Sequence, residues 1–334
     1  MHKQKQQVVT LLLETFITRI AMFMSVPFLM IYLSQLFHFS PVELSLIVSI
    51  SPLVTMLFGP FGGYTSDKIS LDKLLRIVPF IWGLIYLLFT VASTFSAFLV
   101  LNGLSGICYV IHETAVKKVL SLNATLQNRK KLFNLRYACL AMGALIGPLL
   151  QFFLHDPPIT VAYAILGGSY LLEGLLNCFF FSPSNGRRPQ HPSKKQVTKT
   201  IMPEPRNILL FLCFLTGTAF SYFAYAQFQS TVSLFFTTSE QIVSGKDRYS
   251  LMLSANSLLI LLLQIPLFYY LKKTSALKLI SVSNGLFAVS LLLIGKSNNW
   301  LVFFLMVACY SLAEVLLGSN FDYLVDSFTT EQNK

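Results

Sequence analysis

The chain has 334 residues, of which 54% are hydrophobic and only 12% are charged, and 30 are phenylalanine. A soluble domain carries about 25% charged residues, so this composition excludes an ordinary water-exposed surface. The net charge of +11 would suit nucleic-acid binding, but the basic residues lie in turns between apolar runs, and we expect no nucleic-acid partner.

Ten apolar runs each approach the roughly 20 residues that a membrane-spanning helix needs. They lie near residues 8–33, 43–66, 74–94, 96–116, 133–154, 159–181, 207–236, 249–271, 276–295 and 299–321. Because the runs are continuous and not alternating, the sequence predicts an all-α, polytopic membrane protein. The first run is too long for a cleavable signal peptide, and no small-residue cleavage site follows it, so we expect a retained helix.

A proline-rich basic segment, residues 182–206, separates six runs in residues 1–181 from about four runs in residues 207–334. Its composition predicts a cytoplasmic linker between two helical bundles. A weak repeat supports two related halves, because Lys68-x4-Lys73-Leu74 and Lys273-x4-Lys278-Leu279 stand at corresponding positions.

The basic residues divide unevenly between the two sides when successive loops alternate. Of the 25 Lys and Arg residues, only Lys246, Arg248 and Lys296 fall on the second side, and Arg19 lies within a run. Since basic loops stay inside, this predicts a multi-pass protein of the cytoplasmic membrane with both termini in the cytoplasm. The five cysteines lie in apolar runs without metal or redox spacing, so we expect no metal site.

A charged loop follows the second run. Residues 62–68 read Gly-Gly-Tyr-Thr-Ser-Asp-Lys, and Lys73 follows shortly after. The loop resembles the signature loop of the major facilitator superfamily, Gly-x-x-x-Asp-Arg/Lys-x-Gly-Arg-Arg/Lys. The resemblance implies a conformational latch, in which Lys68 and Lys73 hold Asp67 by charge pairing and Gly63 lets the helix end close to its neighbour. Ser70, Leu71 and Asp72 depart from the pattern, and an ordinary charged cytoplasmic turn is the alternative.

A second motif, Gly143-x-x-x-Gly147-Pro148, resembles the Gly-x-x-x-Gly-Pro element of the drug–proton antiporter branch of this superfamily. The glycines would permit close helix packing, and the proline would bend the helix. The alternative is one more packed membrane helix. Where members of this branch have an Arg-x-x-x-Gly element, this chain has Asn102 to Gly106, so the arginine is lost.

The superfamily has twelve helices, and the resemblance implies that the last two are missing. Residues 321–326 then resemble the start of the loop after the tenth helix.

Polar residues inside the apolar runs are the candidates for a binding site. A charge at the bilayer centre costs about 2.5–3.5 kcal/mol, so these side chains should face the bundle interior. In the superfamily, helices 1, 4, 7 and 10 line a central cavity. The candidates for a substrate or proton cavity are Glu14, Arg19, Asn102, Tyr109, Glu113, Tyr225, Gln229 and Glu314. The alternatives to a place in the cavity are structural: Glu14 lies at the membrane interface, Arg19 forms a structural ion pair, and Glu113 lies at the end of a helix. Glu173 is expected to pair within its own bundle.

No metalloprotease, serine-hydrolase or phosphate-binding motif is present, so we expect no enzyme and no cofactor beyond a proton gradient. The resemblance implies secondary active transport of a small molecule by alternating access. We expect proton-coupled efflux of amphipathic compounds by a monomer in the bilayer. The alternatives are an uptake symporter for a small solute and a non-transporting truncated remnant.

Overall fold

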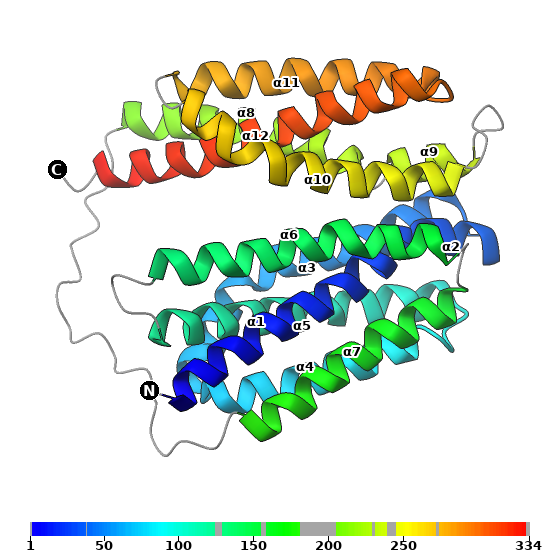
Figure 1. The fold of residues 1–334 in the computed structure, drawn as a ribbon, viewed down its shortest axis with the longest axis vertical. Coiled ribbons are helices and arrows are strands. Elements are labelled where there is room, and N and C mark those ends of the chain that lie inside the picture. The colour runs from blue at the N-terminus through cyan, green and yellow to red at the C-terminus, as the bar shows by residue number, and fades with distance from the viewer. Residues whose placement is uncertain are drawn as a thin grey trace. The chain divides into compact units, whose positions relative to one another are not determined.

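The computed structural model describes residues 2–37, 39–123, 129–154, 158–180, 205–228, 231–238, 245–271 and 274–331 (Figure 1). These ranges contain helices and no β-strand. The chain divides into two compact units, Met1–Ser193 and Lys194–Lys334. The division falls inside the predicted linker 182–206, of which residues 182–204 lie outside the described part of the chain.

The first unit contains the six predicted spans. Its helices are α1 (His2–Ser25), η1 (Val26–Phe28), α2 (Leu29–Leu36), α3 (Pro41–Lys68), α4 (Leu71–Leu88), α5 (Phe95–Asn123), α6 (Arg129–Phe153) and α7 (Ile159–Phe180). The first run is interrupted at Pro27 because proline has no backbone N–H to donate. The Ser25 hydroxyl lies 2.9 Å from the Ala162 carbonyl oxygen and so ties this interruption to α7.

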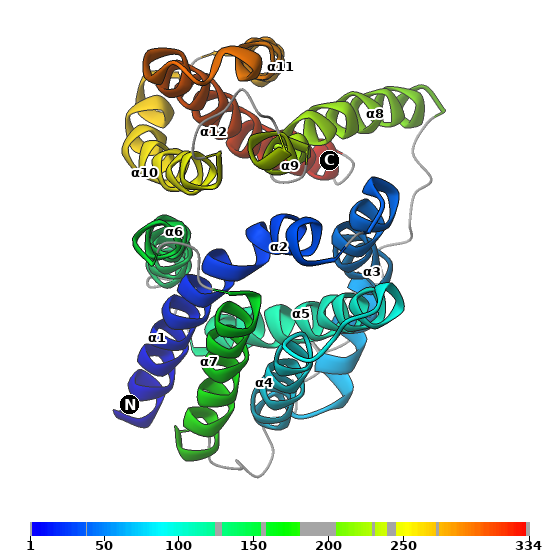
Figure 2. The same ribbon diagram turned by 90° about the vertical axis from the view of Figure 1, so that its right-hand side faces the viewer.

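The packing within the first unit pairs helices that are distant in sequence. α3 packs on α5, α1 packs on α6 and α7, and α4 packs on α5 and α7 (Figure 2). The centre is aromatic: the Trp82 and Tyr170 ring centroids are 4.2 Å apart, and Phe89 stacks on Tyr163 at 4.7 Å. Large apolar side chains such as Met56 and Leu57 lie exposed on α3, as lipid-facing residues of a membrane helix do.

The second unit contains the four remaining predicted spans. Its helices are α8 (Pro205–Gln227), α9 (Thr231–Thr238), α10 (Gly245–Leu271), α11 (Ala276–Leu293), η2 (Ile294–Lys296) and α12 (Trp300–Glu331). The seventh run is thus divided between α8 and α9. α12 packs on α10 and α11, and the Phe228 and Tyr310 rings stack with centroids 3.4 Å apart.

One boundary prediction was wrong. Residues 321–326 were expected to begin a loop, but the backbone of α12 continues as a helix to Glu331. The stretch from Gly318 onward contains no proline and no further glycine, so nothing in the sequence terminates the helix there.

Seven helical segments of the described residues are long and apolar enough to cross a membrane. They are Gln6–Leu36, Pro41–Lys68, Phe95–Asn123, Leu135–Phe153, Ile159–Phe180, Ala276–Lys296 and Trp300–Gly318. α4, α8 and α10 are absent from this set although each matches a predicted run. The 18 residues of α4 include Asp72, Lys73 and Arg76, and these charges in the first turns lower its mean hydropathy.

Candidate functional site

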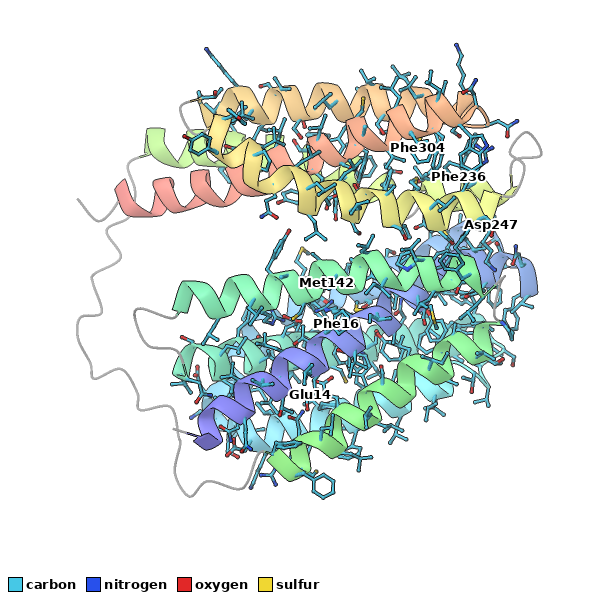
Figure 3. All side chains as sticks on the ribbon, in the orientation of Figure 1. Glu14, Phe16, Met142, Phe236, Asp247 and Phe304 are labelled. Atoms are coloured by element: carbon cyan, nitrogen blue, oxygen red, sulfur yellow. The ribbon has the colours of Figure 1, made fainter. Side chains whose placement is uncertain are left out.

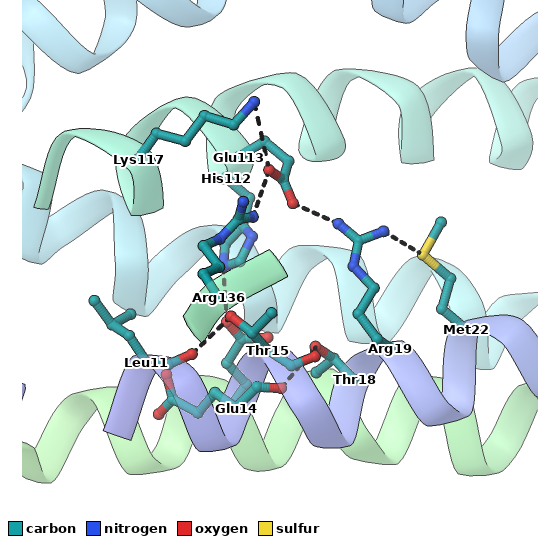
Figure 4. Close-up of polar contacts among 11 residues, drawn as sticks. Leu11, Glu14, Thr15, Thr18, Arg19, Met22, His112, Glu113, Lys117 and Arg136 are labelled. Atoms are coloured by element: carbon teal, nitrogen blue, oxygen red, sulfur yellow. Dashed lines mark hydrogen bonds and ion pairs between the residues drawn. The ribbon is translucent and has the colours of Figure 1, made fainter. Parts of the chain in front are cut away.

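Glu113 is the centre of a buried ionic cluster in the first unit (Figure 4). Its Oε1 atom lies 2.5 Å from Arg19 Nη2 on α1, and its Oε2 atom lies 2.6 Å from Arg136 Nη2 on α6. Lys117, one turn later on α5, approaches Oε2 at 3.9 Å. We call Arg19, Glu113, Lys117 and Arg136 the Glu113 cluster. It joins helices α1, α5 and α6 through one carboxylate.

The Glu113 cluster pairs charges that would be costly to bury alone, with two buried guanidinium groups sharing one carboxylate. The side chains of Glu113, Arg19 and Arg136 expose only 11%, 14% and 8% of their surface. Burying an isolated ion costs several kcal/mol, and pairing offsets much of that cost. Tyr109 lies beside the cluster, with its ring centroid 5.8 Å from the Arg19 guanidinium carbon. The structure therefore brings together three of the predicted cavity residues: Arg19, Tyr109 and Glu113.

A second buried polar group lies between α1, α5 and α7. Glu14 exposes 2% of its surface and is a neighbour of Glu173 and Asn177. His112 Nε2 lies 2.7 Å from Glu173 Oε1. We call Glu14, His112, Glu173 and Asn177 the Glu14 cluster; Figure 3 shows Glu14 on α1. Glu14 is therefore buried inside the first unit, and Glu173 pairs within its own bundle as predicted.

A small polar hollow lies beside the Glu113 cluster and His112. Its walls comprise the side chains of Thr15, Thr18, Arg19, Trp82, His112, Glu113, Val116, Arg136 and Tyr170. Guanidinium, hydroxyl and imidazole groups surround it, so an ordered water there would find several hydrogen-bond partners.

The predicted residue Asn102 lies apart from both clusters. Its Nδ2 atom donates to the Ile47 carbonyl oxygen of α3 at 2.6 Å, and its Oδ1 atom accepts from Ser105 at 3.2 Å. The bond to Ile47 fastens α5 to α3, and the bond from Ser105 lies within α5.

A third cluster lies in the second unit around Glu314 of α12. Its Oε2 atom accepts a hydrogen bond from Asn256 Nδ2 of α10 at 3.0 Å, and Oε1 accepts one from the Tyr225 hydroxyl of α8 at 3.3 Å. The Ser311 hydroxyl donates to Asn256 Oδ1 at 2.7 Å. We call Tyr225, Asn256, Ser311 and Glu314 the Glu314 cluster. Gln229, predicted to belong here, lies outside the described residues.

The Glu314 cluster differs from the Glu113 cluster in its charge. Within the described residues, no Lys, Arg or His forms an ion pair with Glu314. Its hydrogen-bond donors are a neutral amide and a neutral phenol. The carboxylate thus lies in a polar but uncompensated setting, where loss of its charge by protonation would remove a desolvation cost.

The loop after the second span holds Asp67 differently from the prediction. Asp67 Oδ1 pairs with Lys118 Nζ of α5 at 2.6 Å, and the same ammonium lies 3.4 Å from the Gly63 carbonyl oxygen. Lys68 instead lies over the Tyr64 ring, and Lys73 is exposed. The expected pairing with Lys68 and Lys73 was therefore wrong. Adjacent residues point to different faces of a helix, so Lys68 is badly placed to pair with Asp67.

The expected close packing at Gly63 was also wrong. A Cβ atom added at Gly63 would meet nothing within 4 Å, whereas one added at Gly62 would lie 2.9 Å from the Val110 carbonyl oxygen. On α6, a Cβ at Gly143 would lie 2.6 Å from Arg19 Cβ, and one at Gly147 would lie 2.6 Å from the Ile20 carbonyl oxygen. The Gly143–Pro148 segment thus lies directly against the α1 backbone.

Three functional candidates escaped the sequence reasoning. Arg136 looked like one more basic residue of a cytoplasmic loop, although it lies two turns into α6. Lys118 was counted only toward topology. Asn256 is an amide within an apolar run, and its proximity to the polar positions Ser254 and Ser257 was the available signal.

Known proteins with similar sequences agree with this architecture. A protein called "Uncharacterized MFS-type transporter YqjV", from Bacillus subtilis (strain 168), is 29% identical over 317 residues, which cover 95% of this chain and 77% of that protein. A Na(+), Li(+), K(+)/H(+) antiporter from Planococcus maritimus is 22% identical over 340 aligned residues, covering 92% and 78% of the two chains.

Solved structures are similar in fold. The crystal structure of the nucleoside transporter NupG superposes with a TM-score of 0.75 at 11% identity, covering 96% of this chain and 82% of that one. At this identity the likeness concerns the fold alone. The family model described as Major Facilitator Superfamily matches residues 11–334, so this chain belongs to that superfamily of multi-pass membrane transporters, which are not enzymes.

Proposed function

We propose that this chain is a proton-coupled exporter of amphipathic compounds, and that Glu314 exchanges the coupling proton. The observation that carries the proposal is the Glu314 cluster, where a buried carboxylate has only neutral hydrogen-bond donors. Carboxylates of this kind inside a membrane protein commonly mark proton pathways.

Protonation of Glu314 would change what its neighbours can do. The ionised carboxylate accepts hydrogen bonds at both oxygens, from Asn256 of α10 and from Tyr225 of α8. The protonated form has one O–H donor and less acceptor capacity, so these two bonds would rearrange. Because the partners belong to different helices, one proton would alter how α8, α10 and α12 pack within the second unit.

In the first unit, we assign Arg19, Tyr109 and Glu113 to the substrate or proton path, with Arg136 as a further member. Their charges are paired, and the neighbouring hollow has aromatic walls from Trp82 and Tyr170. An aromatic and ionic surface of this kind suits amphipathic compounds, which combine an apolar body with a charged or polar group. Asn102 has a packing role in this account because its donor is bonded to Ile47.

The proposed direction of transport and the proposed membrane topology rest on separate observations. The Gly143–Pro148 element resembles that of drug–proton antiporters, and the Planococcus relative carries an antiporter name, so export in exchange for protons is favoured. The uneven distribution of Lys and Arg favours the cytoplasmic membrane, with both termini in the cytoplasm. The Asp67–Lys118 ion pair is the proposed conformational latch. Uptake of a small solute by the same proton site is the second candidate.

The experiment is dye efflux from cells that express the whole chain, with ethidium as the amphipathic probe. Export predicts faster loss of ethidium than in control cells, and abolition of that difference by a protonophore. Glu314→Gln keeps the shape of the side chain and removes its ionisable group, so it should abolish the efflux. Asp247→Asn, which changes a partly exposed carboxylate at the start of α10, is the matched control. Accumulation of the probe would instead favour uptake.

A further inference from the structure

We propose that Glu14, Glu173 and Asn177 form a site for a small monovalent metal cation, Na+ in the first instance, inside the first unit. The three side chains come from α1 and α7 and expose 2%, 2% and 0% of their surface. The binding of the ion is independent of transport; only its use as a coupling ion would rest on the proposed function.

Four oxygen atoms in this group are buried and accept no hydrogen bond of standard geometry among the described residues. They are Glu14 Oε1 and Oε2, Glu173 Oε2 and Asn177 Oδ1. The other polar atoms are engaged: Glu173 Oε1 lies 2.7 Å from His112 Nε2, and Asn177 Nδ2 donates to the Leu75 carbonyl oxygen at 3.0 Å. The bond to Leu75 fixes the orientation of the amide. Buried acceptors without donors are costly, so this group calls for a positive ligand.

The cationic side chains around the group do not supply the positive charge that its oxygens require. Arg19 of α1, Arg136 of α6 and Lys117 of α5 all pair with Glu113. Arg76 of α4 follows Leu75, but no ion pair joins it to either carboxylate within the described residues. His112 faces Glu173 and Tyr170 flanks the imidazole, with ring centroids 6.5 Å apart. Two carboxylates therefore share at most one imidazolium, and a bound charge of +1 would complete the balance.

The donor atoms select the kind of ion. Carboxylate and amide oxygens suit hard cations, while transition metals prefer the nitrogen and sulfur ligands that this group does not offer freely. Within the described residues, no three His, Cys, Asp or Glu side chains are grouped so as to hold a metal. Two acids and one amide make a smaller, weaker site, which fits a monovalent ion. A proton supplies one donor, whereas a metal ion can accept lone pairs from several oxygens at once.

The test measures the thermal stability of the purified full chain in detergent at constant ionic strength, with choline chloride replaced stepwise by NaCl, LiCl or KCl. A ligand that binds only the folded state raises the melting temperature with its concentration. The proposal predicts a saturable rise with Na+ or Li+. It also predicts that Glu14→Gln and Glu173→Gln each raise the half-saturating concentration by about tenfold or more. Glu314→Gln should keep the rise, so failure of this site and failure of the proposed proton site are distinguishable.

A second measurement needs no variant. If one proton competes for the same oxygens, the half-saturating Na+ concentration of the unaltered chain should increase as pH falls, by up to about tenfold per pH unit. A melting temperature that is the same whichever cation is present overturns the proposal. So does a Na+ effect that survives both glutamine substitutions. A pH-dependent stability with no response to Na+ or Li+ would show that the carboxylates take protons only, and would overturn it equally.

Discussion

Arg136 of α6 and Glu113 of α5 form an ion pair, with Nη2 and Oε2 2.6 Å apart. The second oxygen of the same carboxylate bonds Arg19 of α1. α6 packs mainly on α1, and this pair links it to α5 as well. One carboxylate thus holds three helices together, and the two guanidinium groups depend on it for their counter-charge.

The first prediction concerns the removal of that carboxylate charge. Glu113→Gln would leave Arg19 and Arg136 buried without an anion, and breaking a buried pair in this way costs about 3–5 kcal/mol. We expect a clear fall in the melting temperature of the detergent-solubilised chain. Lys117→Gln is the control, because Lys117 is 58% exposed and lies 3.9 Å from Glu113. Its effect should stay below about 1 kcal/mol. Equal effects of the two substitutions would contradict the central role of Glu113.

The second prediction compares two adjacent glycines of α3. A methyl group at Gly62 would collide with the Val110 backbone, whereas one at Gly63 would meet nothing within 4 Å. Gly62→Ala should therefore destabilise the first unit by about 1–3 kcal/mol. Gly63→Ala should be neutral or slightly stabilising, since alanine favours a helix. Thermal unfolding of the two variants side by side measures the difference. Equal destabilisation would mean that α3 does not approach α5 at Gly62.

The sequence predicts the helices well because membrane spans have a simple signal. Each of the ten apolar runs corresponds to one helix or to two or three consecutive helical segments. What it misses are contacts that depend on helix rotation and on partners distant in sequence. Asp67 pairs with Lys118, 51 residues away, and Glu314 bonds Asn256, 58 residues away. A single sequence shows that such residues are polar and interior, but it does not show which of them meet.

Arg136 shows the limit of the charge-counting rule. Counting Lys and Arg in loops assigns a topology, and Arg136 adds to the basic side in that count. The same residue exposes only 6% of its surface and is an ion-pair partner. Gly62 and Gly63 give a similar lesson, because the motif begins at Gly63, whereas the packing of α3 on α5 shows that Gly62 is the glycine needed for close approach.

The third prediction addresses the proposed latch. Asp67→Asn and Lys118→Gln should each slow ethidium efflux while changing the melting temperature little. The pair is partly exposed, with Asp67 and Lys118 side chains 60% and 30% exposed, and such pairs contribute less than about 1 kcal/mol to stability. The exchanged pair Asp67→Lys with Lys118→Asp should recover part of the rate. Full efflux in both single variants would exclude a latch at this position.

The fourth prediction concerns the hydrogen bonds that the carboxylate of Glu314 accepts. Asn256→Ala removes the shorter of its two hydrogen bonds and frees Ser311, so efflux should fall by about tenfold or more. Tyr225→Phe removes the longer bond to Glu314, of 3.3 Å, and should have a smaller effect. The ratio of efflux rates at equal expression is the measurement. The reverse order of effects would mean that Tyr225, and not Asn256, orients the carboxylate.

The most direct test of the account is the response of ethidium efflux to the proton gradient in cells expressing the unaltered chain and in cells expressing Glu314→Gln. The account predicts that a protonophore stops efflux by the unaltered chain, and that Glu314→Gln cells lose ethidium no faster than cells without the protein. Efflux that continues undiminished both in the presence of the protonophore and in the Glu314→Gln variant would contradict it.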